Sequence, residues 1–127
     1  MGPLNNNRNA LHPTICYLPG VDRFLMLTSG NWLKRIGEDS EPCMLMVYEA
    51  AKPWGPWKVV KSIYLWVGDD PRNRLYEPSI LPKWISPDGQ SLWLAYSDCR
   101  DSHGLNYKFT IQKMTLILKD PPSAPNR

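Results

Sequence analysis

The sequence predicts an all-β protein made of two similar antiparallel repeats. Thirteen of the 127 residues are proline, about twice the usual share, and eight more are glycine, which disfavours a helical bundle. Short apolar runs alternate with strong turn signals along most of the chain. Two related motifs also occur 65 residues apart, which indicates an internal repeat.

The first repeat is expected over residues 12–62, after a flexible lead-in at residues 1–11. Residues 12–18 form a β-prone run, and the Pro-Gly turn that follows leads into a second apolar run at residues 23–29. Both sides of this second strand are largely apolar, so we expect both of its faces to be covered.

The rest of the first repeat contains two more predicted strands. A polar loop precedes an apolar strand at residues 43–49, and a Pro- and Trp-rich turn at residues 50–57 follows it. A fourth strand begins at Lys58, and we expect it at the edge of the sheet because proline is tolerated there.

The second repeat is expected over residues 76–118, after a loop at residues 68–75. Its first strand is predicted at residues 77–85 and contains a proline. The sequence Ser-Pro-Asp-Gly then forms a turn before an apolar strand at residues 90–97.

A polar loop separates this strand from a longer one at residues 106–118, in which the alternation slips and predicts a bulge near Lys113. Residues 119–127 form a Pro-rich tail that cannot join a sheet, so the second repeat lacks a fourth strand. Residues 12–118 are expected to form a single β domain.

The two repeats match each other in detail. His12-Pro-Thr-Ile corresponds to Glu77-Pro-Ser-Ile, and each motif is followed by a turn and an apolar strand that ends in Ser29 or Ser97, 68 residues apart. A repeat of this length made only of strands is typical of β-propeller blades. A β-sandwich of six to eight strands is the alternative.

Two blades do not close a propeller, which needs about four to eight. An isolated pair would expose two large apolar faces, which favours association. We therefore expect self-association or the remainder of a longer propeller as the partner.

The segment from Glu77 to Ser97, with its Pro-Lys-Trp-Ile-Ser-Pro-Asp-Gly stretch, resembles five-bladed β-propellers related to glycoside hydrolases, in particular a domain family of unknown function. The Trp-Gly-Pro-Trp run at residues 54–57 is similar to a blade-closing segment of those proteins. The resemblance spans about residues 12–118. It implies a partial five-bladed propeller, with this chain as its C-terminal blades.

The same segment more distantly resembles propeller hydrolases of the arabinanase and xylosidase type, with a superficial likeness to sialidases. In those enzymes an acidic residue begins the innermost strand of a blade and faces the axial pocket, which implies Glu77 as a candidate catalytic acid. The first repeat has His12 at the equivalent place, where an aspartate is expected. Glycosidases need two carboxylates. A solvated or salt-bridged strand-end glutamate is the simpler interpretation of Glu77.

The loop before Glu77 carries further groups that suit a sugar ligand, because aromatic faces stack on sugar C–H surfaces and charged groups bind polar substituents. An ordinary solvated loop is the simpler interpretation of its charged residues. The candidate ligand-binding residues are Trp66, Asp69, Asp70, Arg72, Tyr76 and His12.

Other classes of function lack support in the sequence. The net charge is only +3, with no basic stripe for a nucleic acid, and no apolar run reaches the ~20 residues that span a bilayer. The three cysteines, Cys16, Cys43 and Cys99, show no metal-binding spacing, and their disulfide state is left open. We expect no cofactor, metal, nucleic acid or membrane as a partner. The polar first ten residues lack a signal-peptide core, and the compartment is left open.

These observations favour a part of a carbohydrate-active-like propeller that binds a glycan or is related to glycosidases. Catalysis by this chain alone is not expected, because a propeller active site draws on several blades. The alternative is a structural or protein-interaction propeller module without catalytic activity.

Overall fold

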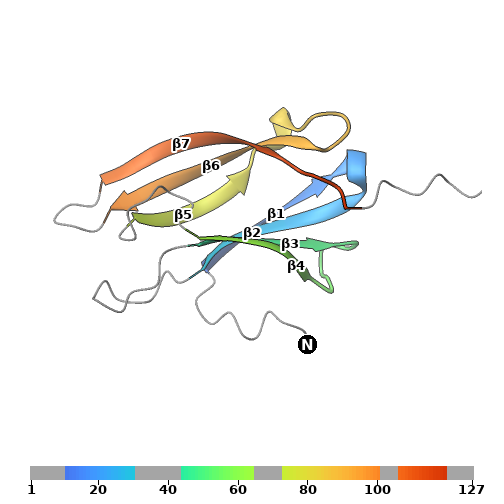
Figure 1. Ribbon diagram of the computed structural model, residues 1–127, viewed down its shortest axis with the longest axis horizontal. Helices are drawn as coiled ribbons and strands as arrows, with labels where there is room; N and C mark the ends of the chain where they lie inside the picture. The colour runs from blue at the N-terminus through green and yellow to red at the C-terminus, as the bar shows by residue number, and fades with distance from the viewer. Residues whose placement is uncertain (1–10, 31–43, 65–72, 101–105, 120–127) are drawn as a thin grey trace, which may run out of the picture.

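The computed structural model describes residues 11–30, 44–64, 73–100 and 106–119. These residues form seven β-strands and two short 3₁₀ turns, and they contain no α-helix. The strands make two antiparallel sheets that lie one above the other (Figure 1). The prediction of an all-β fold is confirmed, and the arrangement is consistent with about two propeller blades.

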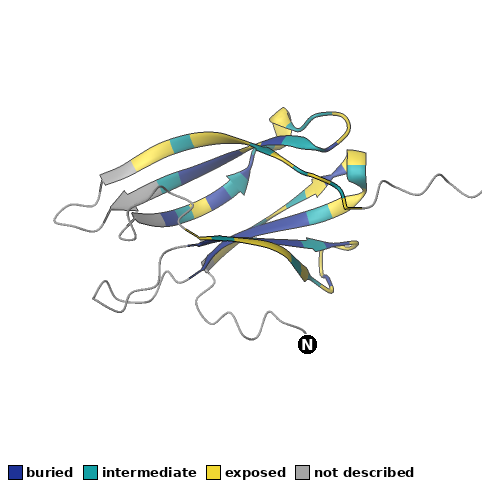
Figure 2. Ribbon diagram, in the orientation of Figure 1, coloured by how far each residue is buried: buried dark blue, intermediate teal, exposed yellow. Residues whose placement is uncertain are grey.

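The first sheet is a four-stranded meander. Its strands are β1 (Leu11–Leu18), β2 (Arg23–Gly30), β3 (Met44–Ala50) and β4 (Lys58–Tyr64), and they pair in chain order. The central strand β2 is buried from Leu25 to Gly30, which confirms that both of its faces are covered. Strand β4 lies at the edge of the sheet, as predicted, and most of it is exposed (Figure 2).

The second sheet is a three-stranded meander. It consists of β5 (Asn73–Ile80), β6 (Ser91–Arg100) and β7 (Asn106–Thr115), again in chain order. Within the described ranges no fourth strand pairs with β7, which is therefore an edge strand.

The predicted strand at residues 77–85 is wrong at both ends. Strand β5 already begins at Asn73 and ends at Ile80, and Pro82–Trp84 form a 3₁₀ turn in which the Trp84 N–H donates to the Leu81 carbonyl at 3.0 Å. Proline favours the first position of a helical turn because its φ is already suitable and its missing N–H is not needed there.

The predicted bulge near Lys113 is also wrong. The β6–β7 register is continuous from Ser91 opposite Thr115 to Arg100 opposite Asn106, and β7 ends at Thr115 instead of residue 118. The alternation slips in the sequence because β7 carries apolar side chains on its exposed face as well as on its covered face. The bulges lie elsewhere, in the β1–β2, β3–β4 and β5–β6 pairs.

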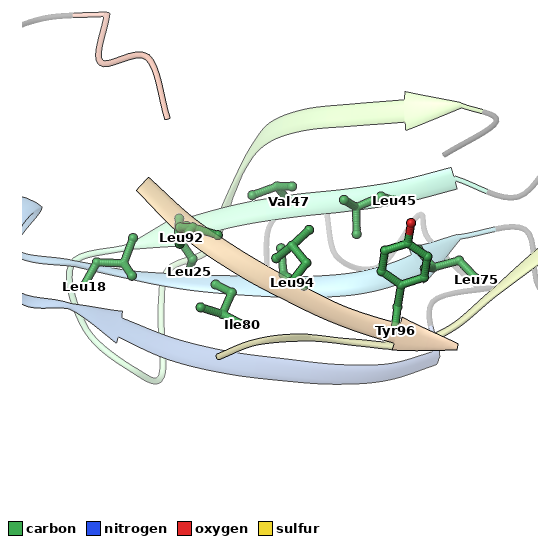
Figure 3. Close-up of a cluster of buried hydrophobic side chains, with 10 residues drawn as sticks. Leu18, Leu25, Leu45, Val47, Leu75, Ile80, Leu92, Leu94 and Tyr96 are labelled. Atoms are coloured by element: carbon green, nitrogen blue, oxygen red, sulfur yellow. The ribbon is translucent and has the colours of Figure 1, made fainter. Parts of the chain in front are cut away.

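The hydrophobic core lies between the two sheets (Figure 3). Leucines from both sheets dominate it, and Leu27, Leu45, Leu92 and Leu94 are completely buried. The full set of core residues is Leu18, Leu25, Leu27, Leu45, Val47, Leu75, Ile80, Leu92, Leu94 and Tyr96.

The internal repeat is present in the strand register. Leu11 lies opposite Ser29 and Thr14 opposite Leu27 in the first sheet. Residues 76 and 97, and 79 and 95, form the equivalent pairs in the second sheet, and the register breaks between them at the same place. The offsets are again 65 residues for the first strand of each sheet and 68 for the second, as the sequence predicts.

The two sheets pack through faces that are not equivalent in the repeat. Alternate side chains of a strand point to opposite faces, so Leu25 and Leu27 share the face of the first sheet that lines the core. Their equivalents, Trp93 and Ala95, lie on the face of the second sheet opposite to the core residues Leu92 and Leu94. In a sandwich with two-fold symmetry, the equivalent faces of the two sheets would pack against each other. In a ring of blades, the front face of one blade packs against the back face of the next, which we call front-to-back packing. The observed packing is front to back.

Candidate functional site

The first strand of each sheet is interrupted by a bulge at an X-Pro pair. His12 and Glu77 occupy these positions and have φ values of 50° and 48°. Positive φ is uncommon for residues other than glycine and costs on the order of 1–3 kcal/mol at each site. The prolines that follow have no N–H for the strand ladder, which explains why the register breaks at these points. Two equivalent positions therefore have the same strained backbone.

The packing of β5 against β1 brings these two residues together. His12 Nδ1 lies 3.7 Å from Glu77 Oε1, although 65 residues separate them in the sequence. Their side chains are 46% and 55% exposed, so the pair is open to solvent and to ligands. An exposed ion pair contributes at most about 1 kcal/mol. Stability alone therefore does not account for two strained residues at this point.

An aromatic ring completes the cluster. The ring of the half-buried Tyr76 and the His12 imidazole meet in a T-shaped arrangement, with centroids 5.4 Å apart and an interplanar angle of 63°. We call His12, Tyr76 and Glu77 the HYE cluster. It contains an imidazole, a phenol and a carboxylate on two adjacent first strands.

A hydrogen bond next to the cluster fixes the two strands to each other. The Thr14 hydroxyl on β1 donates to the Pro78 carbonyl on β5 at 2.5 Å. Pro78 is fully buried. Sequence reasoning did not identify Thr14 as part of the site, although the repeat places it in register with Ser79 and so next to the same bulge.

The structure brings together the three predicted site residues that it describes, His12, Tyr76 and Glu77. The remaining predicted site residues fall outside the described residues. These are Trp66, Asp69, Asp70 and Arg72.

The chemistry of the HYE cluster suits a ligand rich in hydroxyl groups. The carboxylate accepts hydrogen bonds from hydroxyls, the imidazole can accept or donate them, and the aromatic rings offer an apolar surface. In the described part of the chain Glu77 is paired with an imidazole and not with a carboxylate, so the two-carboxylate arrangement of a glycosidase is not assembled there. The described residues also contain no group of three His, Cys, Asp or Glu side chains that could hold a metal ion.

Among the residues that the structure describes, three titratable groups with shifted pKa values lie outside the cluster. Burial raises the pKa of the Cys16 thiol, and the hydrogen bond that the Tyr17 hydroxyl donates to Asp22 raises the pKa of that tyrosine. The hydrogen bond that the Ser86 hydroxyl donates to the Asp88 carboxylate lowers the pKa of Asp88. The Gln90 backbone N–H, which donates to the same carboxylate, lowers it further. Each of these shifts has a local structural cause in a turn or strand and gives no sign of a second site.

Comparison with known proteins adds no family assignment: no family model, no curated protein and no solved structure matches the chain. Within residues 11–30, 44–64, 73–100 and 106–119, no helix is long and apolar enough to cross a membrane. The repeat geometry and the HYE cluster are therefore the observations that bear on function.

Proposed function

We propose that the chain is a pair of β-propeller blades and that its HYE cluster forms part of an axial binding site for carbohydrate. The front-to-back packing of the two repeats supports the propeller. In such a ring the first strand of each blade lies nearest the axis, so β1 and β5 line the place where propeller ligands bind. The HYE cluster lies on these two strands.

The observation that carries the proposal is the doubled X-Pro bulge. It gives His12 and Glu77 the same strained backbone and places their side chains 3.7 Å apart at an exposed position. Backbone strain that recurs where polar side chains converge is typical of binding and catalytic sites. The resemblance to glycosidase-related propellers is the second support, because it assigns the same position on the strand to a ligand-facing acid.

Glu77 is the candidate acid of this site. Hydrolysis of a glycosidic bond needs a second carboxylate about 5–9.5 Å away, and other blades would have to provide it. We therefore propose binding for the chain itself and a glycosidase-related activity only for the completed propeller.

The test is a binding screen of the purified chain against a panel of neutral and acidic oligosaccharides, with ligand-observed NMR as the readout. Saturable binding is expected for at least one member, and Glu77→Gln or Tyr76→Ala should weaken it at least tenfold. Glu49→Gln is the matched control, because Glu49 is a half-buried glutamate on β3 outside the cluster and its loss should leave binding unchanged. Absence of binding across the panel, or equal binding by all three variants, would refute the proposal.

A structural or protein-interaction module is the second candidate function. One observation favours it: the second sheet presents large apolar side chains to solvent, including Phe109, which is 72% exposed. Exposed apolar patches of this kind mark interaction surfaces. If the carbohydrate screen fails, this function is the one that the fold still supports.

A further inference from the structure

Two exposed side chains on the outer face of the second sheet occupy repeat positions that are buried in the first sheet. On β3, Leu45 and Val47 lie opposite Ser29 and Leu27 and point into the core, where they are 0% and 3% exposed. The equivalent positions on β7, opposite residues 97 and 95, are Phe109 and Ile111. These two side chains are 72% and 39% exposed. The same repeat position is thus buried in one sheet and open in the other.

The first sheet has a matching open position on its other face. Ile80 on β5 lies opposite Leu94 in the second sheet, points into the core and is 7% exposed. Its equivalent on β1 is Ile15, opposite Met26, and Ile15 is 50% exposed. Each sheet therefore has exposed apolar side chains at positions whose repeat equivalents lie in the core: Phe109 and Ile111 on β7, and Ile15 on β1.

We infer that these two faces bind each other between copies of the chain. The outer face of the second sheet, with Phe109 and Ile111, binds the outer face of the first sheet in the next copy. Met26 and Tyr48 are already buried on that face, so its contact surface is the β1 side, where Ile15 and Tyr17 are 50% and 42% exposed. The contact uses, on the β1 side only, repeat positions equivalent to those that pack the two sheets within one molecule.

A contact between two different faces is heterologous, so it forms a ring where the rotation closes. Each copy supplies two blades, and propellers contain about four to eight. The chain should therefore assemble as a discrete ring of two, three or four copies. A ring made only of copies has an even number of blades, so this inference departs from the five blades that the family resemblance implies. It does not depend on whether the HYE cluster binds carbohydrate.

The first experiment is the mass of the purified chain in solution by light scattering, over a range of concentrations. A single mass at two, three or four times 14.6 kDa is expected. Phe109→Lys and Ile15→Lys should each reduce it to that of one chain, with unchanged far-ultraviolet circular dichroism. Trp54→Lys is the control, because Trp54 is 77% exposed but lies in the turn between β3 and β4. It should leave the mass unchanged.

The second experiment mixes the two disrupted variants. Phe109→Lys keeps the first-sheet face and Ile15→Lys keeps the second-sheet face, so one intact contact is possible and the mixture should contain a dimer of the two. A contact between two like faces would give no such dimer and would overturn the inference. A wild-type chain that is monomeric at every concentration would also overturn it. Other proteins or further polypeptide would then be the partners of the two faces.

Discussion

Equivalent substitutions in β3 and β7 should have very different effects on stability. Leu45 and Phe109 occupy the same position of the repeat, but Leu45 is 0% exposed and Phe109 is 72% exposed. Truncation of a fully buried leucine to alanine costs about 2–5 kcal/mol, because it removes apolar contacts and leaves a cavity. Truncation of a fully buried phenylalanine to alanine costs about 3–5 kcal/mol. Only about a quarter of the Phe109 surface is covered, so the loss for Phe109→Ala scales to about 1 kcal/mol.

The assay is urea denaturation followed by tryptophan fluorescence, at a dilution at which light scattering gives the mass of one chain. Leu45→Ala should lower the free energy of unfolding at least twice as much as Phe109→Ala. Equal losses would refute the packing on which the two inferred faces depend, because they would mean that both positions are covered or that both are open.

Three further predictions concern the junction between the repeats. A Cβ on Gly20 would overlap the backbone carbonyl carbon of Asp88, so Gly20→Ala should force the two turns apart and lower the melting temperature by several degrees. The Ser86 hydroxyl lowers the pKa of Asp88 in the folded chain. The ionised Asp88 therefore stabilises the fold above the pKa of an unfolded aspartate, which is about 4. This stabilisation is lost as the pH falls through the lower pKa of the folded state. Asp88→Asn should therefore show a smaller loss of stability between pH 5 and pH 2 in acid denaturation, and an identical loss would contradict the hydrogen bond. Thr14→Val removes the donor to the buried Pro78 carbonyl and should cost about 1 kcal/mol in urea denaturation, whereas no change would show that this bond does not hold β1 to β5.

Much of the fold could be predicted because the repeat is visible in the residues themselves. The X-Pro motifs at His12 and Glu77 align the first strands, and Ser29 and Ser97 align the second strands with the offset that the register shows. The ends of β5 and β7 could not be predicted in the same way. A proline in an apolar run fits both a strand bulge and a 3₁₀ turn, and only tertiary packing decides between them at Pro78 and Pro82.

The candidate site could be predicted only in part. The repeat identified His12 and Glu77 as equivalent positions, but equivalence in sequence does not show that two residues are in contact. Their contact depends on the front-to-back packing of the sheets, which brings β5 against β1. The hydrogen bond from Thr14 was missed because a threonine in a strand carries no pattern that distinguishes a tertiary donor from an exposed hydroxyl.

The most direct test of the account is a nuclear Overhauser measurement between the rings of His12 and Tyr76. Cross-peaks between their ring protons are expected, because the front-to-back packing of the repeats places the centroids 5.4 Å apart across 64 residues of sequence. Cross-peaks within each sheet, such as those between Ile15 and Met26, serve as the internal control because they are independent of how the sheets pack. Intact cross-peaks within the sheets without any between His12 and Tyr76 would contradict the packing and, with it, the proposed site.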